Sequence, residues 1–154
     1  MIREIKSHED LKRAFELVGE VFSEFVAVDY SEQGKNTFES YLKKMLQDTP
    51  GYLEVGDKKV WGYYQDDEII GVFAIRDISH ISIMFVDKEY HRKGIAKKMF
   101  TVFLDELKKN KEVKQITVNS SPYAVKVYEH LGFVKMGEQC EKDGIVFTPM
   151  MRLL

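Results

Sequence analysis

Apolar residues recur every three or four positions along the first 46 residues, which is the spacing of one face of an α-helix. Ser7 precedes this pattern and Asp10 follows three positions later, so Ser7 is expected to cap the start of the first helix. The core-facing residues of this helix are expected to be Leu11, Phe15, Val18, Phe22 and Phe25. Residues 27–36 are polar and irregular, and a second helix is expected from about Thr37 until Pro50-Gly51 ends it. Its apolar face comprises Phe38, Tyr41, Leu42, Met45 and Leu46.

The middle of the chain changes to short apolar runs that are typical of β-strands. Two runs, 59–64 and 68–75, flank Gln65-Asp66-Asp67, and this arrangement predicts a β-hairpin. A third strand is expected over 79–86. These strands form a first group in the predicted order of elements.

Helices and strands alternate in the second half. A helix after Gly94 is expected to bury Ala96, Met99, Phe100, Phe103, Leu104 and Leu107. A short strand over 115–119 precedes another helix, which begins at Ser121-Pro122 and ends at Gly132. Its expected inner face comprises Ala124, Val127, Tyr128 and Leu131. Segments 133–140 and 145–153 are expected to form a final antiparallel pair.

The order of elements indicates the fold class. Two helices and three strands are followed by helix, strand, helix and two strands, with room for an additional strand at the N-terminus. A mixed order with one strand-helix-strand unit implies an α/β fold whose sheet is partly antiparallel. The three prolines are scattered, and no repeat or linker interrupts the pattern, so residues 1–154 are expected to form a single domain.

Composition narrows the function classes. The formal net charge of −2 argues against a nucleic-acid binder, which would usually be basic. No apolar run approaches the roughly 20 residues that span a bilayer, and the first residues do not resemble a signal peptide. The single cysteine, Cys140, excludes an internal disulfide and a metal site built from cysteines. We therefore expect a cytoplasmic protein without metal and without a membrane partner.

The most informative segment is the basic, glycine-bearing stretch that follows the third strand, His91 to Met99. A loop between a strand and a helix exposes unpaired main-chain N–H groups, and the helix dipole favours negative charge there. Gly94 and Ala96 are small, so a phosphate can approach the main chain. The segment predicts a phosphate-rich ligand at Arg92 to Lys97. The alternative is a tight turn at Gly94 with solvated lysines, and the segment matches neither a P-loop nor a dinucleotide-binding fingerprint.

Two segments resemble motifs of the GNAT superfamily of N-acetyltransferases. Residues 86–96 are similar to its acyl-CoA-binding motif, Gln/Arg-x-x-Gly-x-Gly/Ala after a strand, with His91 in the Gln/Arg position. His91 is a departure from the motif and is expected to be an exposed loop residue. Asn119, Ala124, Tyr128 and Gly132-Phe133 are similar in spacing to the superfamily's other signature segment. The resemblance covers essentially the whole chain, because the order of elements is also that of the superfamily.

The resemblance implies a GNAT-like α/β fold, with a mixed, partly antiparallel central sheet that is flanked by helices and splayed between its two central parallel strands. It also implies that acetyl-CoA is the cosubstrate. The residues that it assigns to cofactor binding are Met84, Val86, His91, Arg92, Lys93, Gly94, Ile95, Ala96, Lys97 and Asn119. In this assignment, the main-chain N–H and C=O groups of Met84 and Val86 bind the pantetheine arm. The main-chain amides of residues 92–97 bind the pyrophosphate.

Tyr128 is the candidate catalytic residue, because the resemblance places it near the thioester sulfur, where it would protonate the departing thiolate. Core packing alone would also explain a tyrosine on this apolar helix face. A main-chain N–H near Met84 could stabilise the oxyanion. His80 is either a base or a satisfied, half-buried histidine, and we favour the second interpretation. No covalent intermediate is required.

The acceptor is expected to be a primary amine, and an amine on a small molecule is favoured over an amine on a protein. The resemblance points to Glu24, Asp29, Tyr30, Glu32 and Glu138, whose carboxylates would favour a cation, although they could equally be surface charges. Part of the cluster Trp61, Tyr63 and Tyr64 could line the same cleft.

The sequence therefore predicts an N-acetyltransferase. The alternative is a non-catalytic acyl-CoA sensor or interaction module. Nucleic-acid binding through the basic loop is disfavoured by the acidic balance. Antiparallel edge strands make a homodimer a further expectation.

Overall fold

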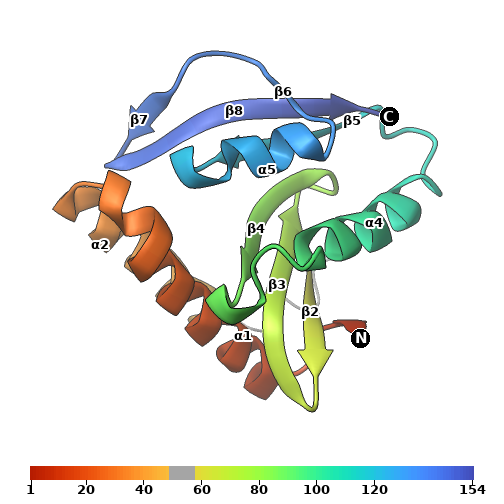
Figure 1. Cartoon of the computed structure of the whole chain (residues 1–154), viewed down its shortest axis with the longest axis horizontal. Helices are drawn as coiled ribbons and strands as arrows, with labels where there is room; N and C mark the ends of the chain where they lie inside the picture. The colour runs from red at the N-terminus through yellow and green to blue at the C-terminus, as the bar shows by residue number, and fades with distance from the viewer. Residues whose placement is uncertain (49–57) are drawn as a thin grey trace.

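The central element is a mixed sheet with the strand order β1-β2-β3-β4-β5-β8-β6, and β7 pairs separately with β8 (Figure 1). The structure is a computed structural model and describes residues 1–48 and 58–154. Within these residues, the strands are β1 (Ile2–Glu4), β2 (Lys59–Gln65), β3 (Glu68–Arg76), β4 (His80–Val86), β5 (Gln115–Ser120), β6 (Val134–Lys135), β7 (Cys140–Lys142) and β8 (Ile145–Leu153). Every pairing among these described strands is antiparallel except that of β4 with β5. The predicted mixed sheet is therefore confirmed.

Helices cover both faces of the sheet. They are α1 (His8–Val21), α2 (Glu32–Gln47), α4 (Ile95–Leu107) and α5 (Val125–His130). Four short helical turns connect these elements, namely η1 (Phe22–Val26, a π-helix), η2 (Ala27–Asp29), η3 (Lys88–Tyr90) and η4 (Pro122–Ala124). Figure 1 shows α1 and α2 on one side of β3 and β4, and α4 and α5 on the other.

Each helical layer has its own apolar core. Residues of α1 pack with Val60, Val72 and Ile83, whereas residues of α4 pack with Phe73, Ile81 and other residues of the central strands. This division follows from the pleat, because successive residues of a strand point to opposite faces of the sheet. Strand β3 is buried on both faces and anchors both layers.

The sheet opens between its two parallel strands. Only two residue pairs join β4 to β5, His80 with Thr117 and Ile81 with Val118. Both strands continue beyond these pairs without further partners between them, so a gap widens toward their C-terminal ends. The splay that the sequence predicted is present.

A β-bulge coincides with the point where the gap begins. Ala74 lies opposite Ile83, but Ile75 lies opposite Ile81, so β4 carries Ser82 as an additional residue. A bulge bends its strand and increases the local twist. We therefore attribute the divergence of β4 from β5 to the bulge at Ser82.

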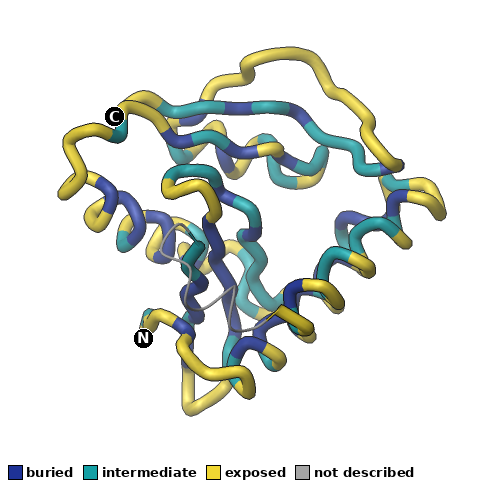
Figure 2. Tube along the Cα trace, turned by 180° about the vertical axis from the view of Figure 1, so that it is seen from behind, coloured by how far each residue is buried: buried dark blue, intermediate teal, exposed yellow. Residues whose placement is uncertain are grey.

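Three sequence-based boundaries were wrong. Helix α2 begins at Glu32 rather than Thr37, because the Ser31 hydroxyl accepts a hydrogen bond from the Gly34 N–H at 3.2 Å and supports a polar first turn. The expected strand over 133–140 is reduced to β6, and all of residues 134–143 are exposed (Figure 2). The helix expected from Ser121 starts with the turn η4 before α5.

The inner face expected for the last helix was wrong at one residue. Val127 is 38% exposed and does not face the core, because the short helix α5 turns only Tyr128 fully inward. The expected end of the second helix, at Pro50-Gly51, lies outside the described residues.

Two expectations about the N-terminal region are confirmed. The Ser7 hydroxyl caps α1, because it accepts a 3.2 Å hydrogen bond from the Asp10 N–H. The additional N-terminal strand is β1.

Close backbone contact joins the start of α2 to the β7–β8 turn. A Cβ added to Gly34 would overlap the main-chain oxygen of Gly144, and the Thr37 hydroxyl donates to the main-chain oxygen of Asp143 at 2.8 Å. Because both partners at the overlap are backbone, we expect Gly34→Ala to lower the free energy of unfolding by about 2 kcal/mol.

Gly19→Ala is the matched control. A Cβ at Gly19 would meet only Leu42 Cδ1, at 3.8 Å, and alanine is favoured over glycine inside a helix. This variant should be more stable by about 0.5–1 kcal/mol. Urea unfolding of both variants checks the pair, and equal changes of either sign would contradict the close contact at Gly34.

Candidate active site

The edge of β4 that faces the gap presents main-chain groups that do not pair with β3. The Asp87 N–H donates to the Ile70 oxygen at 2.8 Å, which fixes the alternation of hydrogen bonds between β4 and β3. In an antiparallel pair, the N–H and C=O groups of one residue both point toward the partner strand, and those of the next residue both point away from it. The register is constant from Asp87 back to Ile83. Met84 and Val86 therefore direct their N–H and C=O groups away from β3, toward the gap.

The basic loop lies at the end of β4 and leads into α4. Arg92 and Gly94 have φ angles of +63° and +77°, and alternating backbone conformations of this kind can turn successive N–H groups toward one anion. The Gly94 oxygen accepts the first helical bond, from the Lys98 N–H at 3.0 Å. No side chain caps this helix. The N–H groups in its first turn therefore remain available to a ligand.

Space and charge at the loop fit a phosphate. A Cβ built on Gly94 meets nothing within 4 Å, so the main chain is open there. Arg92, Lys93, Lys97 and Lys98 are exposed around it. The first turn of α4 contains no acidic residue. The predicted phosphate-binding loop therefore has a geometry and a charge suited to a pyrophosphate.

His91 differs from its expected exposed position. It is half-buried, and its Nε2 lies 2.7 Å from the Val86 oxygen. The ring of Phe25 lies 5.0 Å from the His91 ring, and the Tyr123 hydroxyl lies 3.4 Å from Nδ1. These contacts bring together η1, the basic loop and η4, which are far apart in sequence.

Tyr128 is fully enclosed, with 4% of its surface exposed, and its ring packs edge-to-face on Phe133 with 5.5 Å between centroids. Burial raises the pKa of the Tyr128 hydroxyl above its ordinary value, so the group stays protonated at neutral pH. No hydrogen bond holds this hydroxyl within residues 1–48 and 58–154. Tyr128 belongs to the apolar cluster against which Met84 and Val86 pack, on the α4 side of the sheet.

Asn119 and His80 occupy opposite ends of the parallel pair. Asn119 is exposed near the C-terminal end of β5, beyond the point where the strands separate. His80 lies where the strands are still paired, and its Nδ1 is 2.8 Å from the Thr117 hydroxyl. Burial lowers the pKa of His80 and keeps the ring neutral. This is the satisfied, half-buried histidine that we favoured.

The candidate acceptor residues divide into two groups. Glu24, Asp29, Tyr30 and Glu32 lie along the connection from α1 to α2, and Glu138 lies on the exposed segment between β6 and β7. Two of them are paired, since Lys88 approaches Glu24 at 3.4 Å and Lys35 approaches Glu32 at 3.3 Å. Burial and Asp29 raise the pKa of Tyr30 to about 12, so this residue offers a neutral hydroxyl.

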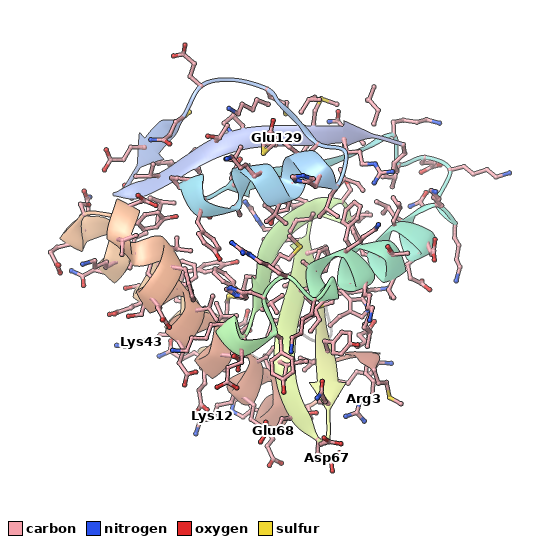
Figure 3. The ribbon with its side chains drawn as sticks, viewed as in Figure 1. Arg3, Lys12, Lys43, Asp67, Glu68 and Glu129 are labelled. Carbon is pink, nitrogen blue, oxygen red and sulfur yellow. The ribbon has the colours of Figure 1, made fainter. Side chains whose placement is uncertain are left out.

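The aromatic cluster of β2 does not line the gap, which corrects the sequence-based expectation. Trp61 is buried against Phe73, 5.8 Å between centroids. The Tyr64 hydroxyl donates to Asp10 at 2.9 Å, and Arg3 lies over its ring at 3.8 Å, at the end of the sheet remote from β8 (Figure 3). Strand β3 and strand β4 separate β2 from the gap. A strand's place in the sheet cannot be read from its alternation.

Three residues at the gap were missed by sequence reasoning. Ser82 is the bulge residue, and its hydroxyl is buried without a hydrogen-bond partner among the described residues. Phe25 lies in the π-helical turn η1, where it packs against the α1 core and also contacts the His91 ring. Tyr123 lies inside the second motif, and its position there was the one feature of the sequence that could have identified it. The bulge and the π-helix left no trace in the apolar pattern.

Neither a membrane span nor a metal cluster is found in the part of the chain that the structure describes. No helix there is both long and apolar enough to cross a bilayer, and no three acidic, histidine or cysteine side chains gather around a common point.

Comparison with known proteins agrees with this geometry. The sequence model of the acetyltransferase (GNAT) domain matches residues 26–154. A GCN5-related N-acetyltransferase from Rhodopseudomonas palustris is similar in structure, with a TM-score of 0.82 and 17% identity over 100% of this chain and 95% of the other. A search of curated proteins finds none that matches.

Two further solved structures are informative. The PaiA N-acetyltransferase from Thermoplasma acidophilum, in complex with coenzyme A, has a TM-score of 0.74 and 22% identity over 100% and 99% of the two chains. A mutant form of the spermidine N-acetyltransferase SpeG from Vibrio cholerae has a TM-score of 0.65 and 17% identity over 99% and 94%. At these identities, the likeness concerns the fold. Because the domain model covers most of the sequence, the chain belongs to the GNAT acetyltransferase family.

Proposed function

We propose that this protein is an N-acetyltransferase that transfers the acetyl group of acetyl-CoA directly to a primary amine of a small molecule. The observation that carries the proposal is the gap between β4 and β5. It combines main-chain groups of Met84 and Val86 that point away from β3, on one edge, with the basic start of α4 at the end of β4. Such a gap suits an extended ligand with an amide-bearing arm and a pyrophosphate.

The chemistry requires one bond to form and one to break. The thioester supplies the activated acetyl group. The neutral amine attacks its carbonyl carbon, the C–N bond forms, the C–S bond breaks, and the amine loses one proton while the thiolate gains one. We assign the proton donor to Tyr128, whose raised pKa keeps it protonated. We assign stabilisation of the developing oxyanion to the Met84 N–H. We place Asn119 on the side of β5 that faces the cofactor.

A cationic small molecule is the acceptor that the surface best supports. The connection from α1 to α2 carries Glu24, Asp29 and Glu32, and its Tyr30 supplies a neutral hydroxyl. Carboxylates attract a protonated amine. The fold is also that of a spermidine N-acetyltransferase.

Release of free thiol from acetyl-CoA tests the proposal. The purified protein is incubated with acetyl-CoA and, separately, a polyamine, an amino acid, an amino sugar and a lysine-containing peptide. We expect thiol release that depends on at least one of the small amines. Binding of acetyl-CoA without release for any amine would indicate a sensor instead, and release with the peptide alone would move the acceptor to proteins.

A further inference from the structure

The loop that follows β4 is held by a side chain and not only by its backbone. Its central residue, Arg92, has a φ of +63°, a conformation that non-glycine residues seldom adopt. Such a conformation persists where the surroundings hold it in place. The surroundings here are the contacts of His91, the residue immediately before it.

His91 fastens the start of the loop to the end of β4. Its Nε2 donates to the Val86 oxygen at 2.7 Å, because a carbonyl oxygen can only accept. This bond closes a ring around the turn η3, which is itself capped by a 2.9 Å bond from the Glu89 N–H to Asp87 Oδ1. The end of β4 and the start of the phosphate-binding loop are thereby fixed relative to each other.

The other nitrogen and the ring faces of His91 are also in contact with protein. The Tyr123 hydroxyl, 3.4 Å from Nδ1, can donate to it when Nε2 carries the proton, and this assigns the tautomer. Phe25 lies 5.0 Å from the His91 ring and 5.4 Å from the Tyr123 ring. The ring of His91 is therefore in contact with both η1 and η4.

We propose that His91 is a positioning residue, which shapes the phosphate-binding loop and orients the Val86 carbonyl before the cofactor arrives. The inference rests on the proposed function, because it concerns the same acyl-CoA site. A carbonyl oxygen has two lone pairs, so Val86 can accept from His91 and still accept from the pantetheine arm. A loop that is already shaped loses less conformational entropy on binding.

The expected signature is a change in cofactor affinity without a change in chemistry. His91→Ala should raise the Kd of coenzyme A and of adenosine 3′,5′-bisphosphate about tenfold, because both would place a phosphate on the loop. His91→Gln should recover most of the affinity, since its amide can donate to the Val86 oxygen. With saturating acetyl-CoA and amine, kcat should stay within about twofold, because His91 touches no reacting atom.

His130→Ala is the matched control. His130 also bonds a main-chain oxygen, that of Lys126 at 2.7 Å, but it is exposed on α5 and does not contact the loop. Its cofactor affinity should equal that of the parent, and thermal unfolding of each variant confirms that it is folded.

Three outcomes would overturn the inference. Unchanged coenzyme A binding by folded His91→Ala would mean that the contact does not shape the site, and tighter binding would mean that it obstructs the gap. Failure of His91→Gln to recover affinity would exclude the hydrogen bond as the cause. A fall in kcat at unchanged Kd would place His91 in the chemistry. If the parent protein binds no coenzyme A, the proposed function fails, which is a distinguishable result.

Discussion

Replacing Tyr128 by phenylalanine should lower kcat for acetyl transfer about 100-fold and leave the affinity for acetyl-CoA almost unchanged. The estimate follows from the usual contribution of a positioned general acid. Phenylalanine keeps the buried ring and its edge-to-face contact with Phe133. Only the hydroxyl is lost, and it makes no hydrogen bond to the described part of the chain that its removal could break. Steady-state kinetics and calorimetric titration measure the two quantities separately.

The matched control for this variant is Tyr123→Phe. Tyr123 is 47% exposed and lies on the same segment, and its hydroxyl lies 3.4 Å from His91 Nδ1. Its effect should appear in acetyl-CoA affinity and stay within about fivefold, because the hydrogen bond is long. Similar kcat values for Tyr128→Phe and the parent would show that Tyr128 is a packing residue and would leave the thiolate without an assigned proton donor.

Gly94→Glu should weaken coenzyme A binding at least about 100-fold. A side chain at Gly94 would project into open space at the mouth of the gap, and a carboxylate there would oppose a pyrophosphate at the helix start. The left-handed φ of +77° adds backbone strain. Calorimetric titration of the folded variant provides the measurement.

Gly94→Ala separates strain from charge. It carries the same backbone penalty, of about 1 kcal/mol, but adds no charge. We expect it to weaken coenzyme A binding by no more than about tenfold and to lose as much stability as Gly94→Glu. Equal affinities of the alanine and glutamate variants would show that no anion lies close to Gly94.

The apolar pattern predicted the fold well because the burial of apolar side chains determines both the pattern and the packing of the elements. The spacing from Leu11 to Phe22 and the alternation around the β2–β3 hairpin reflect faces that pack on the sheet, and the structure places them there. Elements without an apolar face were predicted less well. The first turn of α2 is polar and depends on the Ser31 cap, and the exposed segment between β6 and β7 has no burial signal.

The site was predicted in part, for a related reason. The basic loop and Tyr128 lie in motifs with recognisable spacing. The bulge at Ser82, which opens the gap, depends on a register shift between two strands and has no signature within one of them. The contact of Phe25 with His91 likewise joins segments that are far apart in the sequence.

Calorimetric titration of the unmodified protein with acetyl-CoA is the most direct test of the proposed cofactor site. We expect one acetyl-CoA bound per chain, with a Kd on the order of micromolar, as is common for enzyme substrates. No detectable binding of acetyl-CoA, coenzyme A or longer acyl-CoAs would contradict it. The gap between β4 and β5 would then not be a cofactor site, and the basic loop would be a solvated helix start.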